Sequence, residues 1–160
     1  MIGVMATSGW TGTRGIPADG RGQWRRIAVL LESGRSGEVA LTRAVALSHE
    51  HQAELAVVAL APQAKSPRCQ GPSAQGFNDA VRDATAGELE AAGRVIRRRG
   101  GTALVASLLV EGRDPPLERW VDDQAIELVL LPARRPFLAH PRHPQARRLR
   151  GHTQVHIVVP

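Results

Sequence analysis

The sequence predicts a doubly wound, Rossmann-like α/β domain, with a five-stranded, mostly parallel sheet and helices on both faces. Short runs of Val, Leu, Ile and Ala alternate with longer segments whose apolar residues recur at helical spacing. The short runs are apolar at nearly every position, which is typical of strands covered on both faces. The chain has 160 residues, enough for one such domain with its own core.

Five apolar runs are expected to form the strands, and turn signals or helices separate them. They are residues 26–31, 54–61, 102–110, 128–131 and 155–159. Because a crossover between parallel strands is right-handed, this alternation implies a sheet that is wound in both directions from its middle.

Helices are expected between the strands. They are residues 39–52, residues 78–99, a segment that starts at Pro115 and Pro116, and residues 147–150. Ser36 is the expected N-cap of the first helix and Asn78 that of the second. Residues 62–77 are rich in Pro, Gly, Ser and Gln, so we expect a loop there.

Residues 1–24 are expected to be a flexible N-terminal tail, and residues 25–160 the folded domain. The tail is rich in Gly, Thr and Ser and has no periodicity. It also lacks the compact apolar run of a signal peptide. No run in the chain approaches the roughly 20 apolar residues that cross a bilayer. With Cys69 as the single cysteine, no intramolecular disulfide forms, and we expect a cytoplasmic protein without a membrane partner.

The net charge of +6 is carried almost entirely by arginine, because Lys65 is the only lysine. Positive charge favours acidic partners such as nucleotides, nucleic acid or anionic lipid. The arginines are scattered along the chain, however, which GC-rich coding also produces. Tyrosine is absent, so a base-stacking surface for nucleic acid is not expected.

Several junctions between the expected elements resemble those of the universal stress protein family. In that family an acidic residue followed by Gly and Ser ends the first strand, and Glu32-Ser33-Gly34 stand there here. The other similar stretches are residues 53–60, 110–115, 127–130, 149–150 and 156–159. The resemblance covers about residues 25–160. It implies a regulatory or stress-response module with no enzymatic activity.

The segment after the fourth strand departs from the family pattern. Members that bind ATP carry G-x-x-G-x9-G-[ST] there, and those glycines let backbone N–H groups approach the phosphates. Here the segment begins Pro132-Ala133-Arg134-Arg135-Pro136, and His143 and Pro144 stand near the place of the final Gly-Ser. Proline has no N–H to donate. The chain therefore resembles the branch of the family that lacks the ATP loop, and no cofactor is expected.

An alternative is that arginine side chains replace the glycines. Arg134, Arg135 and Arg142 follow the fourth strand, at the end of the sheet where doubly wound domains bind ligands. Guanidinium groups bind phosphate in a bidentate manner. The protein would then bind a nucleotide such as ATP or AMP, or another anion. A solvated arginine-rich loop explains the same residues.

Three further positions match residues that the family places near the nucleotide. Glu32 would contact a hydroxyl or an amine, or it is a turn carboxylate that pairs with a neighbouring arginine. Leu60 and Gly112 would line the adenine pocket, or they are a core residue and a turn residue.

No catalytic constellation is found in the sequence. The patterns G-x-x-x-x-G-K-[ST], G-x-G-x-x-G and G-x-S-x-G are all missing. His140 and His143 form H-x-x-H in a proline-rich segment, but a zinc site needs three or four ligands. We expect neither an enzyme nor a metal site.

The last strand is expected at the edge of the sheet. It consists of Val155, His156, Ile157, Val158 and Val159. Apolar edge strands are usually paired or protected, and in the resembling family this strand pairs across a dimer axis. We therefore expect a two-fold homodimer, together with a protein partner that the sequence does not identify.

Overall fold

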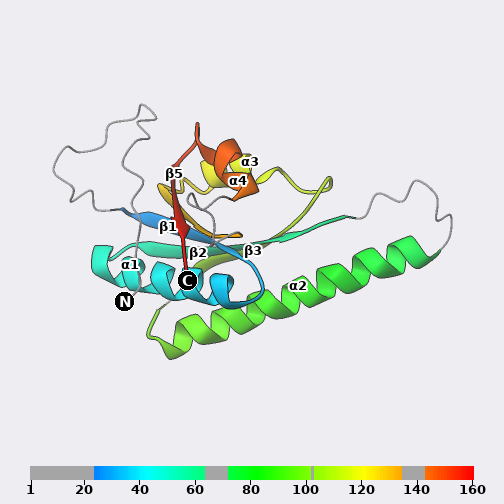
Figure 1. Ribbon diagram of the computed structural model, residues 1–160, viewed down its shortest axis with the longest axis horizontal. Helices are drawn as coiled ribbons and strands as arrows, with labels where there is room; N and C mark the ends of the chain where they lie inside the picture. Colours follow the sequence, from blue (N-terminus) through cyan, green and yellow to red (C-terminus); the bar gives the residue numbers. More distant parts are fainter. Residues whose placement is uncertain (1–23, 64–71, 102, 135–142) are drawn as a thin grey trace.

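A five-stranded parallel sheet forms the centre of the protein (Figure 1). The computed structural model describes residues 24–63, 72–101, 103–134 and 143–160. The strands are β1 (Arg26–Leu31), β2 (Glu54–Ala61), β3 (Ala103–Val110), β4 (Leu128–Pro132) and β5 (Gln154–Val158). Their order is β3-β2-β1-β4-β5, and every pairing is parallel. The chain therefore adds β2 and β3 on one side of β1 and then β4 and β5 on the other, so the winding changes direction between β1 and β4.

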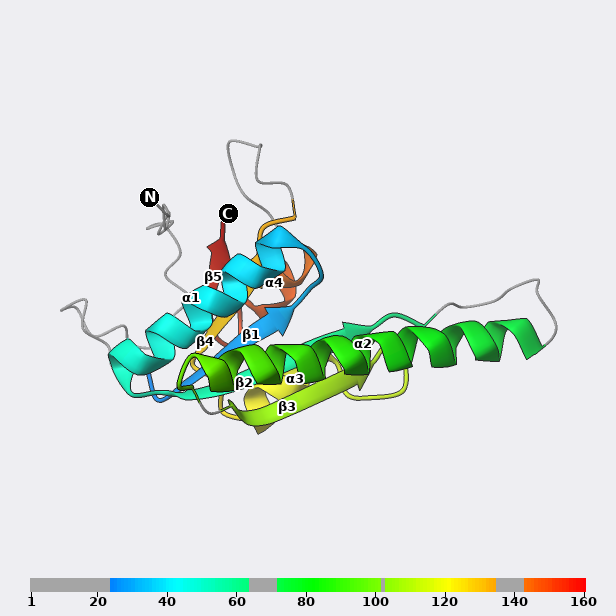
Figure 2. The same ribbon diagram turned by 90° about the horizontal axis from the view of Figure 1, so that it is seen from below.

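Two helices cover each face of this sheet. In Figures 1 and 2, α1 (Arg35–His51) and α2 (Pro72–Arg98) lie on one face. The shorter helices α3 (Leu117–Asp123) and α4 (Pro144–Leu149) lie on the other. The predicted fold class is confirmed: a doubly wound α/β domain with helices on both faces.

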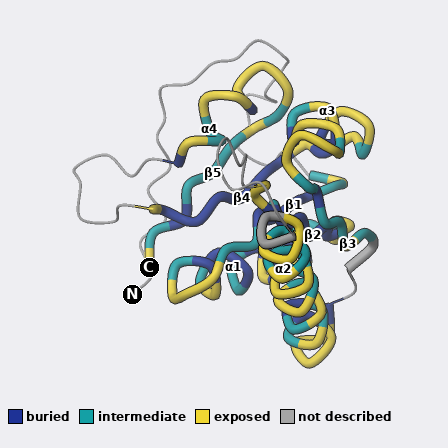
Figure 3. The backbone as a smooth tube through the Cα atoms, turned by 90° about the vertical axis from the view of Figure 1, so that its right-hand side faces the viewer, coloured by how far each residue is buried: buried dark blue, intermediate teal, exposed yellow. Residues whose placement is uncertain are grey.

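The core consists of two apolar layers that share the strands. Ile27 and Val29 of β1 face the layer that α1 and α2 cover. Ala28 and Leu30 face the layer that α3 and α4 cover. Figure 3 shows the buried backbone concentrated in the central strands, with much of α2 exposed. Burial on both faces explains why the strands are continuously apolar rather than alternating.

Helix α1 begins one turn earlier than the sequence predicts. It starts at Arg35, and Gly34 with φ 90° is its N-cap, so the prediction of Ser36 as N-cap is wrong. A Cβ placed on Gly37 would lie 1.7 Å from the backbone oxygen of Glu32. The first turn of α1 thus packs directly on the end of β1, which only glycine at position 37 permits.

Helix α2 is also longer than predicted, because its 27 residues begin at Pro72 and include part of the expected loop. Asn78 lies inside the helix and is not its N-cap. Proline is well tolerated at a first helical position, where its missing N–H has no partner to lose. Figure 2 shows this end of α2 extending past the strands, where Phe77 is 57% exposed. Because these first turns extend past the sheet, their residues need no apolar stripe, and their Pro, Gly, Ser and Gln content predicted a loop instead.

Smaller corrections concern both ends of the chain. Strand β5 spans Gln154–Val158, so Val159 lies just outside the strand that was predicted to contain it. Trp24, predicted to belong to the tail, is packed in the domain, and its indole Nε1 donates to Gln154 Oε1 at 3.2 Å. Residues 1–23 lie outside the described part of the chain.

Candidate functional site

The candidate site lies at the carboxyl ends of β1 and β4, where the winding of the sheet changes direction. Doubly wound domains bind ligands at this switch point, because the two neighbouring connections leave on opposite faces. Glu32 follows the last residue of β1, and Arg134 follows β4 by two residues. β1 and β4 are hydrogen-bonded neighbours, so the topology alone brings these two side chains to the same place.

Arg134 and Glu32 form a bidentate ion pair. The Arg134 Nη2 donates to Glu32 Oε1 at 2.6 Å, and Arg134 Nε donates to Oε1 at 3.0 Å and to Oε2 at 3.3 Å. The Glu32 side chain is 22% exposed and that of Arg134 is 57% exposed. Guanidinium and carboxylate match in shape and charge in this arrangement, so the arginine is held over the switch point by an internal partner.

His143 provides a second donor to the same carboxylate. Its side chain is fully buried, and its Nε2 lies 2.9 Å from Glu32 Oε1. The Nδ1 atom accepts a hydrogen bond from the backbone N–H of Gln145 at 3.1 Å. Since Nδ1 acts as the acceptor, the ring hydrogen is on Nε2, which donates to Glu32. His143 thereby caps α4 and links its first turn to the end of β1.

The environment of Glu32 favours its charged form. Burial raises the pKa of this carboxyl, but the hydrogen bonds from His143 and Arg134, together with the electrostatic attraction of these two side chains, outweigh it. The net result is a Glu32 pKa below its usual range. The carboxylate is therefore ionised at neutral pH. We call Glu32, Arg134 and His143 together the Glu32 cluster.

The turn between β1 and α1 is fixed as well. Ser33 Oγ donates to Glu88 Oε1 of α2 at 2.7 Å, and the Glu38 N–H donates to the Gly34 carbonyl oxygen at 3.1 Å. Together with the contact of Gly37 on Glu32, these bonds hold the position of the Glu32 backbone. The Glu32 cluster is consequently supported from β1, α1 and α2 on one side and from α4 on the other.

The structure brings only some of the predicted site residues together. Glu32 and Arg134 are in contact, whereas Arg135 and Arg142 lie outside the described residues. Leu60 is partly buried and packs on the core layer of α3 and α4. Gly112, with φ 78°, forms the turn after β3. These two positions fit the core and turn alternatives that the sequence left open.

His143 is a residue of the cluster that sequence reasoning missed. From the sequence it was considered as half of H-x-x-H, with no metal site expected, and as a residue near the place of the family's final Gly-Ser; His140 lies outside the described residues. The position of His143 directly before Pro144 was the available signal, because proline favours the first helical position and leaves the preceding residue as the cap. Among the described residues, no group of three or more His, Cys, Asp or Glu side chains could hold a metal ion.

Strand β5 occupies one edge of the sheet, as predicted, with β4 as its neighbour. Val158 is buried, while Val155, His156 and Ile157 are partly exposed. Burial lowers the pKa of His156, and the positive charge of Arg43 lowers it further. This edge therefore carries no charged strand residue at neutral pH. None of the described helices is long and apolar enough to cross a membrane.

The fold is similar to that of several solved structures. No family model matches the sequence, and a search of curated proteins gives no match. A universal stress protein family member from Burkholderia pseudomallei has a TM-score of 0.67 at 22% identity, with 87% of this chain and 98% of that chain covered. UspA from Lactobacillus plantarum has a TM-score of 0.60 at 18% identity, with 84% and 97% covered.

A third similar structure contains a ligand. The universal stress protein from Archaeoglobus fulgidus in complex with dAMP has a TM-score of 0.57 at 19% identity, and the match covers 84% of this chain and 98% of that chain. Identities this low establish likeness of fold. The chain has the fold of the universal stress proteins, and the resemblance seen in its sequence is confirmed at that level.

Proposed function

We propose that this chain is a non-enzymatic regulatory or stress-response module of the universal stress protein type. It works as a homodimer in the cytoplasm and does not hold ATP through a glycine loop. The observation that carries the proposal is the Glu32 cluster, in which Arg134 and His143 already bind a carboxylate at the switch point. The chain supplies its own anion where a related fold would present a ligand site.

The sequence from the last residue of β4 to the first residue of α4 supports this proposal. Residues 132–144 contain no glycine and four prolines, which are Pro132, Pro136, Pro141 and Pro144. A phosphate cradle of the family's type depends on close backbone approach and on several N–H donors. Proline contributes no N–H group, so this stretch is poor in the donors that such a cradle uses.

The chemistry of the cluster supports a role without catalysis. The lowered pKa of Glu32 makes the carboxyl a weak general base at neutral pH, and His143 and Arg134 already bind it. The nearby Ser33 hydroxyl donates to the exposed carboxylate of Glu88. A catalytic serine pairs instead with a base that a third group orients, usually a histidine held by a carboxylate.

A thermal-shift titration tests the proposal directly. The full chain is heated with ATP, AMP, cyclic AMP or pyrophosphate, with and without magnesium. A ligand at one hundred times its Kd stabilises the native state by about 2.7 kcal/mol, which raises Tm by several degrees. We expect no shift with any of the four compounds. A nucleotide-dependent rise in Tm for the unmodified chain would overturn the proposal.

A second function, anion binding through arginine side chains, is favoured by one specific observation. Arg134 is more than half exposed and stands at the switch point, and a protein of this fold binds dAMP. If phosphate displaces Glu32 from Arg134, pyrophosphate will raise Tm for the unmodified chain. Arg134→Gln will remove that shift, whereas the control Arg147→Gln, at an exposed arginine of α4, will retain it.

The dimer is proposed from the exposed edge of β5. This strand is partly apolar and carries no charge at neutral pH, and the chain lacks the edge lysines that commonly block edge-to-edge contacts. A second copy of the same strand is the partner that a two-fold axis would supply. Sedimentation equilibrium across a range of protein concentrations measures the association directly.

A further inference from the structure

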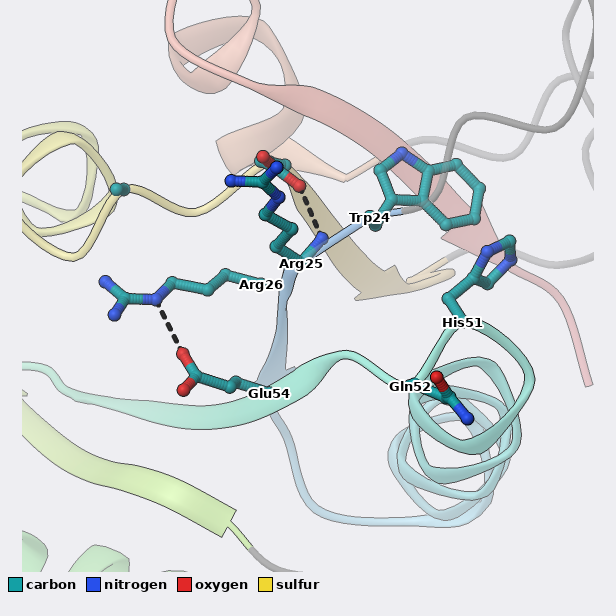
Figure 4. A pocket seen from close by; sticks show the side chains of 8 residues that line it. Trp24, Arg25, Arg26, His51, Gln52 and Glu54 are labelled. Carbon is teal, nitrogen blue, oxygen red and sulfur yellow. Dashed lines mark hydrogen bonds and ion pairs between the residues drawn. The ribbon is translucent and has the colours of Figure 1, made fainter.

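A second site lies at the opposite end of the sheet from the Glu32 cluster. A cavity of about 570 Å³ opens where β1, β2 and β4 begin, and Figure 4 shows the side chains around it. This volume lies within the usual range for small-molecule sites. None of the described residues assigned to nucleotide or anion binding lines it, so its ligand is a separate question from the proposed function.

One wall of this cavity, which we call the amino-end pocket, is aromatic. The Trp24 ring meets the His51 ring edge-on at a centroid distance of 4.5 Å, and it meets the His156 ring at 5.9 Å. Its indole Nε1 also donates to Gln154. Trp24 is thus held by α1 and by β5, and a ring held in this way can contact an apolar group without losing much conformational freedom on binding.

The other walls carry charges of both signs in fixed positions. Arg26 Nε donates to Glu54 Oε2 at 2.7 Å, and Arg26 Nη1 donates to the Gln124 carbonyl oxygen at 3.0 Å. Glu127 Oε2 accepts the backbone N–H of Arg25 at 2.6 Å. In the described residues, no ion pair to the Arg25 guanidinium is found. In the view of Figure 4 the Arg26 side chain lies between those of Arg25 and Glu54.

Two backbone positions at the rim are strained. Gln52, with φ 52°, and Ala125, with φ 50°, are the two non-glycine residues with positive φ among the described residues, and both line the pocket. Each follows the end of a helix, where glycine is the usual choice. Both belong to helix-ending turns, in which the Ala53 N–H donates to the Ser48 oxygen and the Ile126 N–H to the Val121 oxygen, and these turns fix the backbone of two lining residues.

We propose that the amino-end pocket binds a small zwitterion, namely an α-amino acid with an apolar side chain. The Arg25 guanidinium receives the carboxylate, and the Trp24–His51 wall packs on the side chain. Glu54, Glu127 and the carboxyl-terminal end of α1 attract the ammonium group, because a helix end of this kind carries partial negative charge. A ligand with a single charge would contact either the Arg25 guanidinium or the two carboxylates, but not both.

Calorimetric titration of the full chain with three matched compounds tests this assignment. L-phenylalanine carries both charges, phenethylamine lacks the carboxylate, and 3-phenylpropionate lacks the ammonium group. We expect phenylalanine to bind at least about tenfold more tightly than either analogue, since each loses a charge-assisted contact. Equal affinity for all three compounds, or no heat with phenylalanine, would refute the zwitterion assignment.

A pair of variants places the ligand in the pocket. Arg25→Ala removes the guanidinium but keeps the backbone N–H that binds Glu127, so the fold is retained. It should weaken phenylalanine binding at least about tenfold and bring it to the level of phenethylamine. Arg113→Ala, at an exposed arginine beyond β3, should leave the phenylalanine affinity unchanged. Equal losses in both variants, or none in Arg25→Ala, would show that the carboxylate binds elsewhere.

Discussion

Replacing Glu32 with glutamine removes one charge from the Glu32 cluster and changes the side-chain shape very little. In the native protein both carboxylate oxygens accept bonds from Arg134, and Oε1 also accepts from His143. Glutamine keeps one acceptor oxygen and gains an amide NH2, which cannot accept from a second donor. The Glu32→Gln variant therefore leaves Arg134 or the buried His143 with a poor partner.

The size of the effect follows from the exposure of the two donors. A hydrogen bond to a charged group contributes about 1.5–3 kcal/mol when it is buried, while an exposed ion pair contributes about 0–1 kcal/mol. His143 is fully buried, whereas Arg134 is 57% exposed. We expect Glu32→Gln to lower the free energy of unfolding at pH 7 by about 1–2 kcal/mol, mostly through His143.

Urea denaturation at pH 3 to pH 7 measures both the size and the cause of this loss. Because the native pKa of Glu32 lies below its ordinary value of 4.5, the stabilisation is present above pH 4.5 and is lost as pH falls through the native pKa. The difference between the two proteins should therefore shrink toward pH 3. A pH-independent difference, or one no larger than that of the control Glu90→Gln on exposed α2, would refute the role of the charge.

Three further predictions concern the backbone and the edge strand. Gly37→Ala should destabilise the fold by at least about 2 kcal/mol, because its Cβ meets the backbone of Glu32. Gly87→Ala has open space around it in α2 and should stabilise the fold by about 0.5–1 kcal/mol. The midpoints of urea denaturation of the two variants measure both effects. Ala125→Gly should raise the free energy of unfolding by about 0.5–1 kcal/mol by relieving a positive φ, and an unchanged or lower value would contradict the strain at the pocket rim. Ile157→Lys should shift sedimentation from dimer to monomer, while Ala106→Lys on the other edge strand should leave it unchanged; a dimer that survives in Ile157→Lys would exclude pairing through β5.

Much of the fold could be predicted from the sequence because the central strands β1, β2 and β4 are buried on both faces. Such strands appear as uninterrupted apolar runs, and their order with the helices leaves few topologies. The start of α2 was not predictable in the same way. Its first turns extend beyond the sheet, so no apolar stripe distinguishes them from a loop of the same composition.

The position of the candidate site could be predicted from the sequence, but the contacts of its side chains could not. Glu32 and Arg134 each follow a strand that borders the switch point, so their proximity was predictable from strand order. Whether they pair or hold a ligand depends on side-chain geometry that spacing does not determine. The amino-end pocket has no sequence motif, because Trp24 meets His51 only where the segment just before β1 packs on the end of α1, and Glu54 lines the same pocket from the start of β2.

The Glu32 cluster also lowers the affinity of any anion that binds Arg134 at the switch point. A phosphate that uses Arg134 must first displace Glu32, so its observed affinity is reduced by the free energy that holds the carboxylate in place. If that free energy is about 1 kcal/mol, the upper value for an exposed ion pair such as Arg134–Glu32, affinity falls by about fivefold. The arginine-based alternative thus requires pyrophosphate to bind Glu32→Gln more tightly than the unmodified chain by that factor. Pyrophosphate binding that is equal in both proteins would place the anion away from Arg134, and the absence of binding in both would mean that one guanidinium does not replace the N–H groups of a glycine loop.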